Sequence, residues 1–200
     1  MSIREPLIVG GLRVDDNLLE PVTGPTCAPG ACGAACCVGG IWVDLLAVQR
    51  ILDHADDIRP FMAPTYAADE DLWFADVDHA HADFPSGVAL ETTIAPRVAT
   101  PGEDGCIFLD DHHLCAIELA SNHLGLPWPG LKPLECALYP LRQADGVLAY
   151  DETTTAEHPG ATCQRPGQAG VTGARHEVFR RSVELAIGRA GWLALDARKR

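Results

Sequence analysis

The feature that most constrains this fold is a run of cysteines near the N-terminus, "CAPGACGAACC". It contains Cys27, Cys32, Cys36 and Cys37. Residues 20–40 around it are rich in glycine, proline and alanine and show no apolar periodicity, so the segment predicts a loop. A loop of this composition has too few large apolar side chains to order itself by burial. We therefore expect interactions of the cysteine thiols to order this loop.

The other cysteines are spread over the chain, at Cys106, Cys115, Cys136 and Cys163. The N-terminal sequence "MSIREPLIVGGLRV" lacks the apolar core of a signal peptide, and no stretch approaches the roughly 18 apolar residues of a membrane helix. We therefore expect a cytoplasmic protein with no membrane partner, in which thiols stay reduced. In that compartment, eight cysteines indicate metal ligands ahead of disulfides.

Thiolates are soft ligands that suit zinc, Cu(I) and iron–sulfur clusters. The spacing is neither the paired CxxC of a zinc ribbon nor the run of a bacterial ferredoxin. Adjacent cysteines such as Cys36 and Cys37 rarely bond to each other, because the ring strains the backbone, and they suit a polynuclear centre. We predict an iron–sulfur cluster of the 4Fe-4S kind, one or two per chain, with zinc as the alternative. The thiols allow two four-cysteine sites, or one cluster with thiols left over.

Several other residues can be interpreted either as part of a metal site or as ordinary core or surface residues. Cys163 alone could be a small buried apolar residue. His79 and His81 would share one face of a strand, and His158 precedes Cys163 by five residues, but exposure explains most histidines equally well. Lys132 and Arg142 could offset thiolate charge, or be ordinary surface charges.

The charge of the chain limits its partners. The net charge is −13, and a nucleic-acid partner requires a basic face, so none is expected. The C-terminal "RKR" reads as a solvated end. No nucleotide-binding loop, nucleophile elbow or catalytic triad can be argued from the sequence, so no reaction is predicted.

Short apolar segments between turns predict an α+β fold. No linker divides the chain, so we expect one irregular domain over residues 1–200, with short strands and hairpins, a few helices and a cysteine-rich metal-binding centre. Apolar periodicity gives strands around Gly10-Gly11 in residues 6–19, a helix over 43–57 capped by Asp44, strands in 72–79 and 87–94, a helix over 116–123, a hairpin around 144–146, and a helix over 174–191 ended by Gly191.

Four motifs together carry a resemblance to a known family: "CAPGACGAACCV", "GCIFLDDHHLCAIELA", "KPLECALYPLR" and "ATC" near residue 163. With them the chain resembles the bacterial cysteine-cluster proteins described as zinc- or iron-chelating domains (the YkgJ type), and within these a branch of unknown function. The resemblance covers about residues 8 to 195. It implies metal chelation, with these ligands: Cys27, Cys32, Cys36, Cys37, Cys106, Cys115, Cys136 and Cys163.

The flagellin lysine N-methylases are more distantly similar, through their cysteine pattern, and the resemblance there implicates an iron–sulfur cluster in methyl transfer. This chain shows no flagellin or S-adenosylmethionine site, so that activity does not carry over. It also has "GGIWVDLLA" after the double cysteine, where the branch has an acidic "GAPLE"-like segment, and Asp44 is the only carboxylate nearby.

We therefore expect a metal-binding protein whose partners are metal ions. An iron–sulfur cluster would act in redox chemistry, in sensing or as the cofactor of an enzyme. The alternatives are a structural zinc site in an interaction module, or a metal carrier.

Overall fold

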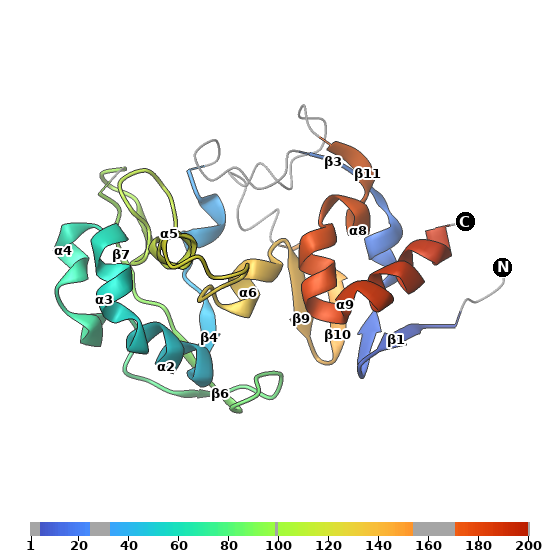
Figure 1. Cartoon of the computed structure of the whole chain (residues 1–200), viewed down its shortest axis with the longest axis horizontal. Helices are drawn as coiled ribbons and strands as arrows, with labels where there is room; N and C mark the ends of the chain where they lie inside the picture. Colours follow the sequence, from blue (N-terminus) through green and yellow to red (C-terminus); the bar gives the residue numbers. More distant parts are fainter. Residues whose placement is uncertain (1–4, 25–32, 99, 154–170, 200) are drawn as a thin grey trace. The chain divides into compact units, whose positions relative to one another are not determined.

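The computed structural model describes residues 5–24, 33–98, 100–153 and 171–199. The protein has the predicted α+β fold, built from short helices and small sheets (Figure 1). The chain forms two compact units: unit 1 is Met1–Ala28 with Leu138–Arg200, and unit 2 is Pro29–Ala137. The expectation of a single domain over residues 1–200 stays a prediction, because this division does not show whether either unit folds alone.

Unit 1 contains a four-stranded sheet in the order β1-β2-β10-β9. Its strands are β1 (Leu7–Val9), β2 (Leu12–Val14), β9 (Leu141–Ala144) and β10 (Val147–Tyr150). The strands predicted around Gly10-Gly11 are confirmed as the antiparallel pair β1 and β2, and the hairpin predicted around 144–146 is confirmed as β9 and β10. Asp145 and Gly146 have φ of 53° and 68°, the left-handed pair that a tight hairpin turn needs.

Helices at the C-terminal end of the chain cover this sheet. The described part of unit 1 also contains η1 (Asp16–Leu19), β3 (Pro21–Gly24), β11 (Val171–Ala174), α8 (Arg175–Val178), α9 (Arg180–Asp196) and η6 (Ala197–Lys199). Val183, Ile187 and Leu195 of α9 are buried in one cluster with Leu148 and Tyr150 of β10. The apolar face predicted for this segment is therefore the face that builds the core.

The predicted end of that helix is wrong. The helix does not stop at Gly191, which is buried, and a Cβ there would lie only 3.0 Å from Val9 and from Ile187. Gly191 is thus a close-packing position. The irregular residue is Gly188, with φ of 68°, and the segment also breaks at Phe179 between α8 and α9.

In its described part, unit 2 has η2 (Ala35–Cys37), then β4 (Trp42–Asp44) and a number of short helices. These are α2 (Leu45–Asp53), α3 (Ala55–Ile58), η3 (Arg59–Phe61), α4 (Pro64–Ala67), η4 (Glu70–Leu72) and α5 (Ala116–His123). Asp44 caps α2 as predicted, accepting a hydrogen bond from the backbone N–H of Leu46 at 2.7 Å. The predicted helix over 43–57 breaks at His54, whereas the predicted helix over 116–123 is confirmed as α5.

Two small sheets complete unit 2. β6 (Val88–Glu91) lies between β4 and β5 (His79–Ala80), and β7 (Ile94–Pro96) pairs with β8 (Asp104–Cys106). The strand predicted over 72–79 is wrong apart from its last residue, because η4 opens that segment and Trp73 is fully buried against Phe108. α3 packs beside α5 at the centre of this unit (Figure 1).

Two further predictions need correction. The loop predicted over 20–40 contains β3 and η2 (Ala35–Cys37) in its described part. The first arm of the hairpin predicted in "ECALYPLRQADGVLAYDE" begins with α6 (Leu134–Leu138) before the chain enters β9.

Candidate metal centre

The described cysteines all lie in unit 2, and all are free thiols. They sit on different elements: η2, the end of β8, the residue that precedes α5, and α6. They are Cys36, Cys37, Cys106, Cys115 and Cys136, and we call them the thiol site. Cys27, Cys32 and Cys163, as well as His158, fall outside the described residues.

A tight turn returns the chain from Cys106 to Cys115. The carboxylate of Asp110 accepts hydrogen bonds from the backbone N–H groups of His112 (2.8 Å) and Leu114 (2.7 Å), which is how an aspartate side chain closes a turn. Leu109 and Cys115 then form an antiparallel bridge. The "DDHH" segment thus positions the second cysteine of this pair at the start of α5.

Cys36 and Cys37 form a close thiol pair, with their sulfur atoms 3.8 Å apart. The hydrogen bond from the Cys37 thiol lowers the pKa of Cys36 to about 7, and the charge of Lys132 acts in the same direction. The same hydrogen bond, together with burial, raises the pKa of Cys37. The pair therefore favours one thiolate and one thiol near neutral pH, and a thiolate is the form that binds metal.

Burial is the main influence on the other three thiols. It raises the pKa of Cys106 to about 11 and also raises the pKa values of Cys115 and Cys136. Each residue keeps some exposed surface, but its sulfur atom is surrounded by protein. A thiolate at one position disfavours a thiolate at the next: Cys136 responds to Cys115 and Cys106, and Cys37 responds to both Cys136 and Cys106. The five sulfur atoms thus belong to one electrostatic unit.

Lys132 is the cation of the thiol site. Its ammonium group lies 2.6 Å from a carboxylate oxygen of Glu118, and its charge lowers the pKa of Cys36, Cys115 and Cys136. Burial opposes the charge on Lys132, but the Cys115 thiolate and Glu118 outweigh it and raise the pKa of the lysine. Arg142, the other residue predicted to offset thiolate charge, lies on β9 of unit 1 and is exposed.

Two polar side chains hold the surrounding backbone. The buried guanidinium group of Arg97 donates to the carbonyl oxygen of Gly33 at 2.5 Å and also contacts His113. The hydroxyl of Thr92 accepts from the backbone N–H of Ile41 at 3.0 Å, and its hydrogen bond to Cys106 lowers the pKa of that thiol against the larger effect of burial.

The thiols are near one another without being arranged as a finished coordination shell. Among the described residues, no three sulfur atoms all lie within 4.8 Å of one another.

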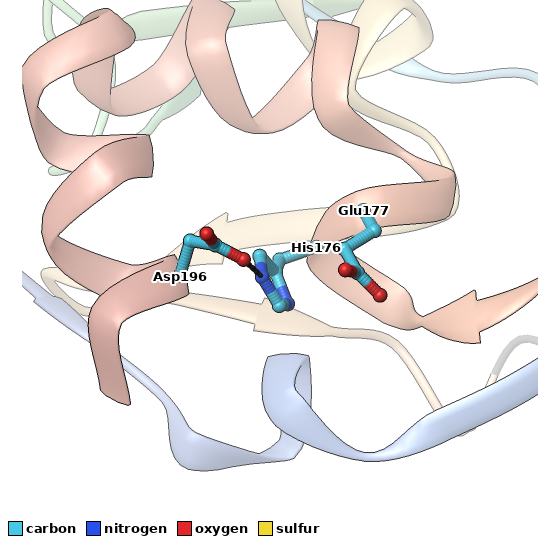
Figure 2. Close-up of side chains that lie close together, drawn as sticks. All are labelled: His176, Glu177 and Asp196. Carbon is cyan, nitrogen blue, oxygen red and sulfur yellow. Dashed lines mark hydrogen bonds and ion pairs between the residues drawn. The ribbon is translucent and has the colours of Figure 1, made fainter. Parts of the chain in front are cut away.

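A second group of possible ligands lies in unit 1, where the sequence showed no motif for it. Ligand atoms of His176, Glu177 and Asp196 all lie within 4.8 Å of one another (Figure 2). The histidine is fully buried, and its Nδ1 and Nε2 face the Leu18 carbonyl oxygen (3.2 Å) and an Asp196 carboxylate oxygen (3.1 Å). His176 and Glu177 are adjacent in α8, whereas Asp196 is the last residue of α9.

The atoms of this group already have partners. Glu177 accepts from the backbone N–H of Ala174 (2.8 Å) and from the ammonium group of Lys199 (2.6 Å). His176 bridges η1 and the end of α9, so its contacts are those of a core residue that ties elements together. The three ligand atoms are close enough together to bind a metal ion. Their existing hydrogen bonds, however, already account for the group as a structural feature of the core.

The other histidines do not join the thiols in any group of three potential ligands among the described residues. His79 and His81 both contact the indole of Trp42, with ring centroids 4.8 and 5.8 Å away. The prediction that they share one face of a strand does not hold, because β5 ends at Ala80 and His81 follows it; the His81 ring also stacks on Phe84.

Comparison of the chain with protein-family models, with curated proteins and with solved structures found no match. The resemblance to cysteine-cluster chelating domains therefore stays a prediction. Within the described part of the chain, none of the helices combines the length and apolar character needed to cross a membrane.

Proposed function

We propose that this chain is a metal-binding protein whose thiol site holds an iron–sulfur cluster, as a redox, sensing or cofactor centre. One observation carries the proposal: free thiols at the end of β8, just before α5, in α6 and in η2 belong to one unit, and a charge on one of them raises the pKa of others. Buried thiols that raise one another's pKa are poorly stable as bare thiolates. A metal cation reverses that penalty, because it binds the deprotonated form.

The cysteine thiols of this site are suitable ligands for an iron–sulfur cluster. Iron–sulfur clusters are held by thiolates, and their potentials depend on net charge, hydrogen bonds to sulfur and exposure to solvent. The thiol site offers sulfur donors, a hydrogen bond from Thr92 to Cys106 and a positive charge on Lys132. The His176 group offers only nitrogen and oxygen donors, which do not suit such a cluster.

When bound, the cluster would supply one-electron chemistry, and the residues of this chain would hold it and set its surroundings. Cys36, Cys37, Cys106, Cys115 and Cys136 are the described candidates for its ligands. Cys27, Cys32 and Cys163 are proposed with them from the sequence. Arg97 would keep the backbone at Gly33 in place through its hydrogen bond to that carbonyl.

Zinc is the second candidate, favoured by the burial of Cys106, Cys115 and Cys136. Structural zinc sites are closed four-ligand sites, often of cysteines alone. The metal would then stabilise unit 2, and the function would be to bind a partner or carry metal. We further propose a cytoplasmic location, since free thiols suit a reducing compartment, and metal ions as the partners in place of nucleic acid or a membrane.

The test is purification without oxygen, followed by a visible spectrum and analysis of iron, sulfide and zinc. Iron and sulfide in similar amounts, with a brown colour that Cys106→Ser removes, support the iron–sulfur proposal. A colourless protein with stoichiometric zinc replaces it with the zinc proposal. Protein without thiol-bound metal, although its thiols are reduced, contradicts both.

A further inference from the structure

The side chain of Arg97 contacts three segments of unit 2 that are far apart in the sequence. Its guanidinium group donates to the carbonyl oxygen of Gly33 at 2.5 Å and also bonds Nδ1 of His113. Its aliphatic part passes over Gly105, where an added Cβ would lie 3.0 Å from Cδ and 3.2 Å from Cγ of the arginine. Only 5% of the side chain is exposed, so these contacts are made inside the unit.

Each of the three contacted residues lies shortly before a described cysteine. The pairs, with the contacted residue first, are Gly33 and Cys36, Gly105 and Cys106, and His113 and Cys115. Arg97 thus acts on the backbone that leads into thiols of η2, of β8 and of the start of α5. A guanidinium group has no lone pair to offer a metal, so its influence is on where these segments lie.

Two of these segments have a backbone conformation that needs outside support. Ala34 and His113 have φ of 53° and 64°, in the left-handed region that residues with a Cβ rarely occupy. Such residues persist where the surrounding structure holds them. Arg97 bonds His113 itself and the carbonyl of Gly33, the residue before Ala34. The carbonyl of Ala34 in turn accepts from the backbone N–H of Cys37 at 2.8 Å.

The place of Arg97 is fixed by its own backbone. It directly follows β7, which pairs with β8, and its N–H donates to the carbonyl oxygen of Glu103 at 2.8 Å. An ordinary ion pair does not account for the burial of its side chain, because the Glu103 carboxylate is 3.4 Å away and 58% exposed. A buried cation is costly unless it is paired and hydrogen-bonded. The bonds to Gly33 and His113 are the close polar contacts that offset this cost.

We infer that Arg97 is a positioning residue of the thiol site, which holds the segments before Cys36, Cys106 and Cys115 in place and thereby strengthens metal binding. This inference rests on the proposed function. Segments that are already in place lose less conformational entropy when a metal binds, so removal of the arginine weakens affinity without removing a ligand. Arginine suits the task because its planar group offers five donors in a fixed arrangement, whereas a lysine carries its donors on one atom.

The variants remove these contacts in steps. Arg97→Ala removes all of them, and Arg97→Lys keeps the charge without the fixed arrangement of donors. His113→Ala removes only one acceptor, whereas His113→Asn keeps an acceptor atom in a residue that tolerates the left-handed conformation. The matched control is His112→Ala, because His112 is the exposed neighbour and the bond to Arg97 comes from His113.

The first measurement is competition with a chelator on folded, anaerobically purified protein. We expect Arg97→Ala to raise the zinc dissociation constant, or to accelerate the loss of an iron–sulfur cluster, by about 10- to 100-fold, as for other residues that orient metal ligands. Arg97→Lys should recover only part of this loss. His113→Ala should weaken binding by a smaller factor, and it provides the test if Arg97→Ala does not fold. His113→Asn and His112→Ala should bind metal as the wild type does.

The second measurement is hydrogen exchange in metal-free protein, which distinguishes a local effect from a general loss of stability. Arg97→Ala should accelerate exchange at the amides of Cys37 and Leu114, which are bonded within the two supported turns. The acceleration should exceed that at amides inside α2 of the same unit.

Unchanged metal affinity in folded Arg97→Ala and His113→Ala overturns this inference and leaves the proposed function standing. Exchange that accelerates by the same factor in α2 as in the two turns does so as well, because the arginine would then support the whole unit equally. Wild type without thiol-bound metal overturns both the inference and the proposed function.

Discussion

The guanidinium group of Arg97 donates a hydrogen bond to the carbonyl oxygen of Gly33, and the two groups are 2.5 Å apart. Gly33 belongs to the cysteine-rich segment, while Arg97 follows β7 directly. The Arg97 side chain is 5% exposed. A residue far along the chain thus holds the backbone three residues before Cys36.

Replacing Arg97 with alanine should destabilise unit 2. The change leaves the Gly33 carbonyl without this donor, and an unmet buried polar group costs about 1–3 kcal/mol. We expect a loss of that size in the free energy of unfolding, measured by urea denaturation. Arg50→Ala, at an exposed position on α2, should change stability by less than about 0.5 kcal/mol. Equal effects of the two substitutions would show that the Arg97 bond does not hold the segment.

Some elements were predictable because local chemistry decides them. Asp44 caps α2, Gly125 with φ of 67° follows α5, and Asp145-Gly146 turns the β9–β10 hairpin. Other elements depend on tertiary contacts. Trp73 is drawn into the core against Phe108, so its segment is not a strand, and Gly191 is kept small by its neighbours and does not end a helix.

Substitutions at two glycines should distinguish the cost of close packing from the cost of a left-handed backbone conformation. Gly125 and Gly130 both have positive φ, but a Cβ at Gly125 would meet nothing within 4 Å, whereas one at Gly130 would lie 2.5 Å from the Ser121 Cβ. Gly125→Ala should cost about 1–2 kcal/mol from the left-handed conformation. Gly130→Ala should cost about 1–3 kcal/mol more through overpacking, and should shift the adjacent Leu131–Lys132 backbone. Equal unfolding free energies for both variants would refute the close contact.

Cys36 should be the most readily alkylated of the described thiols in reduced, metal-free protein. Its pKa is lowered from 9.0 to about 7, mainly by the Cys37 hydrogen bond, so its thiolate fraction is near one half at pH 7 and falls as pH decreases. Cys106, with a pKa raised to about 11, should react slowly below pH 9. Iodoacetamide rates across pH 6–9, read by peptide mass spectrometry, measure both.

The matched variant for that prediction is Cys37→Ala. It removes the thiol that donates to Cys36, so the pH at which Cys36 reacts at half its maximal rate should move upward towards 9. If the pH dependence of Cys36 alkylation is the same in Cys37→Ala as in the wild type, the two thiols do not share a proton.

The site was less predictable than the fold. The family resemblance implied eight cysteine ligands, but three of them lie outside the described residues. Lys132 was recognisable only as one of two basic residues that could offset thiolate charge, and its bond to Glu118 singles it out. The His176 group left no motif, since Asp196 reaches His176 only through the packing of α9.

His176→Ala should destabilise unit 1 without removing metal. The imidazole bonds both Leu18 and Asp196 in the core, so its loss should cost about 1–3 kcal/mol, measured by urea denaturation. His112→Ala, at an exposed position, is the control and should leave stability nearly unchanged. Metal content should stay at the wild-type level in both variants. Loss of metal from folded His176→Ala would move the metal centre to unit 1.

The most direct test of the central claim is X-ray absorption at the edge of the metal that the anaerobically purified protein contains. If the thiol site holds the metal, its inner shell is sulfur, at about 2.3 Å in the case of zinc. Cys136→Ser should then reduce the sulfur contribution or the metal content. An inner shell of nitrogen and oxygen at about 2.0–2.2 Å, unchanged by Cys136→Ser, would contradict the account and indicate ligands such as His176, Glu177 and Asp196.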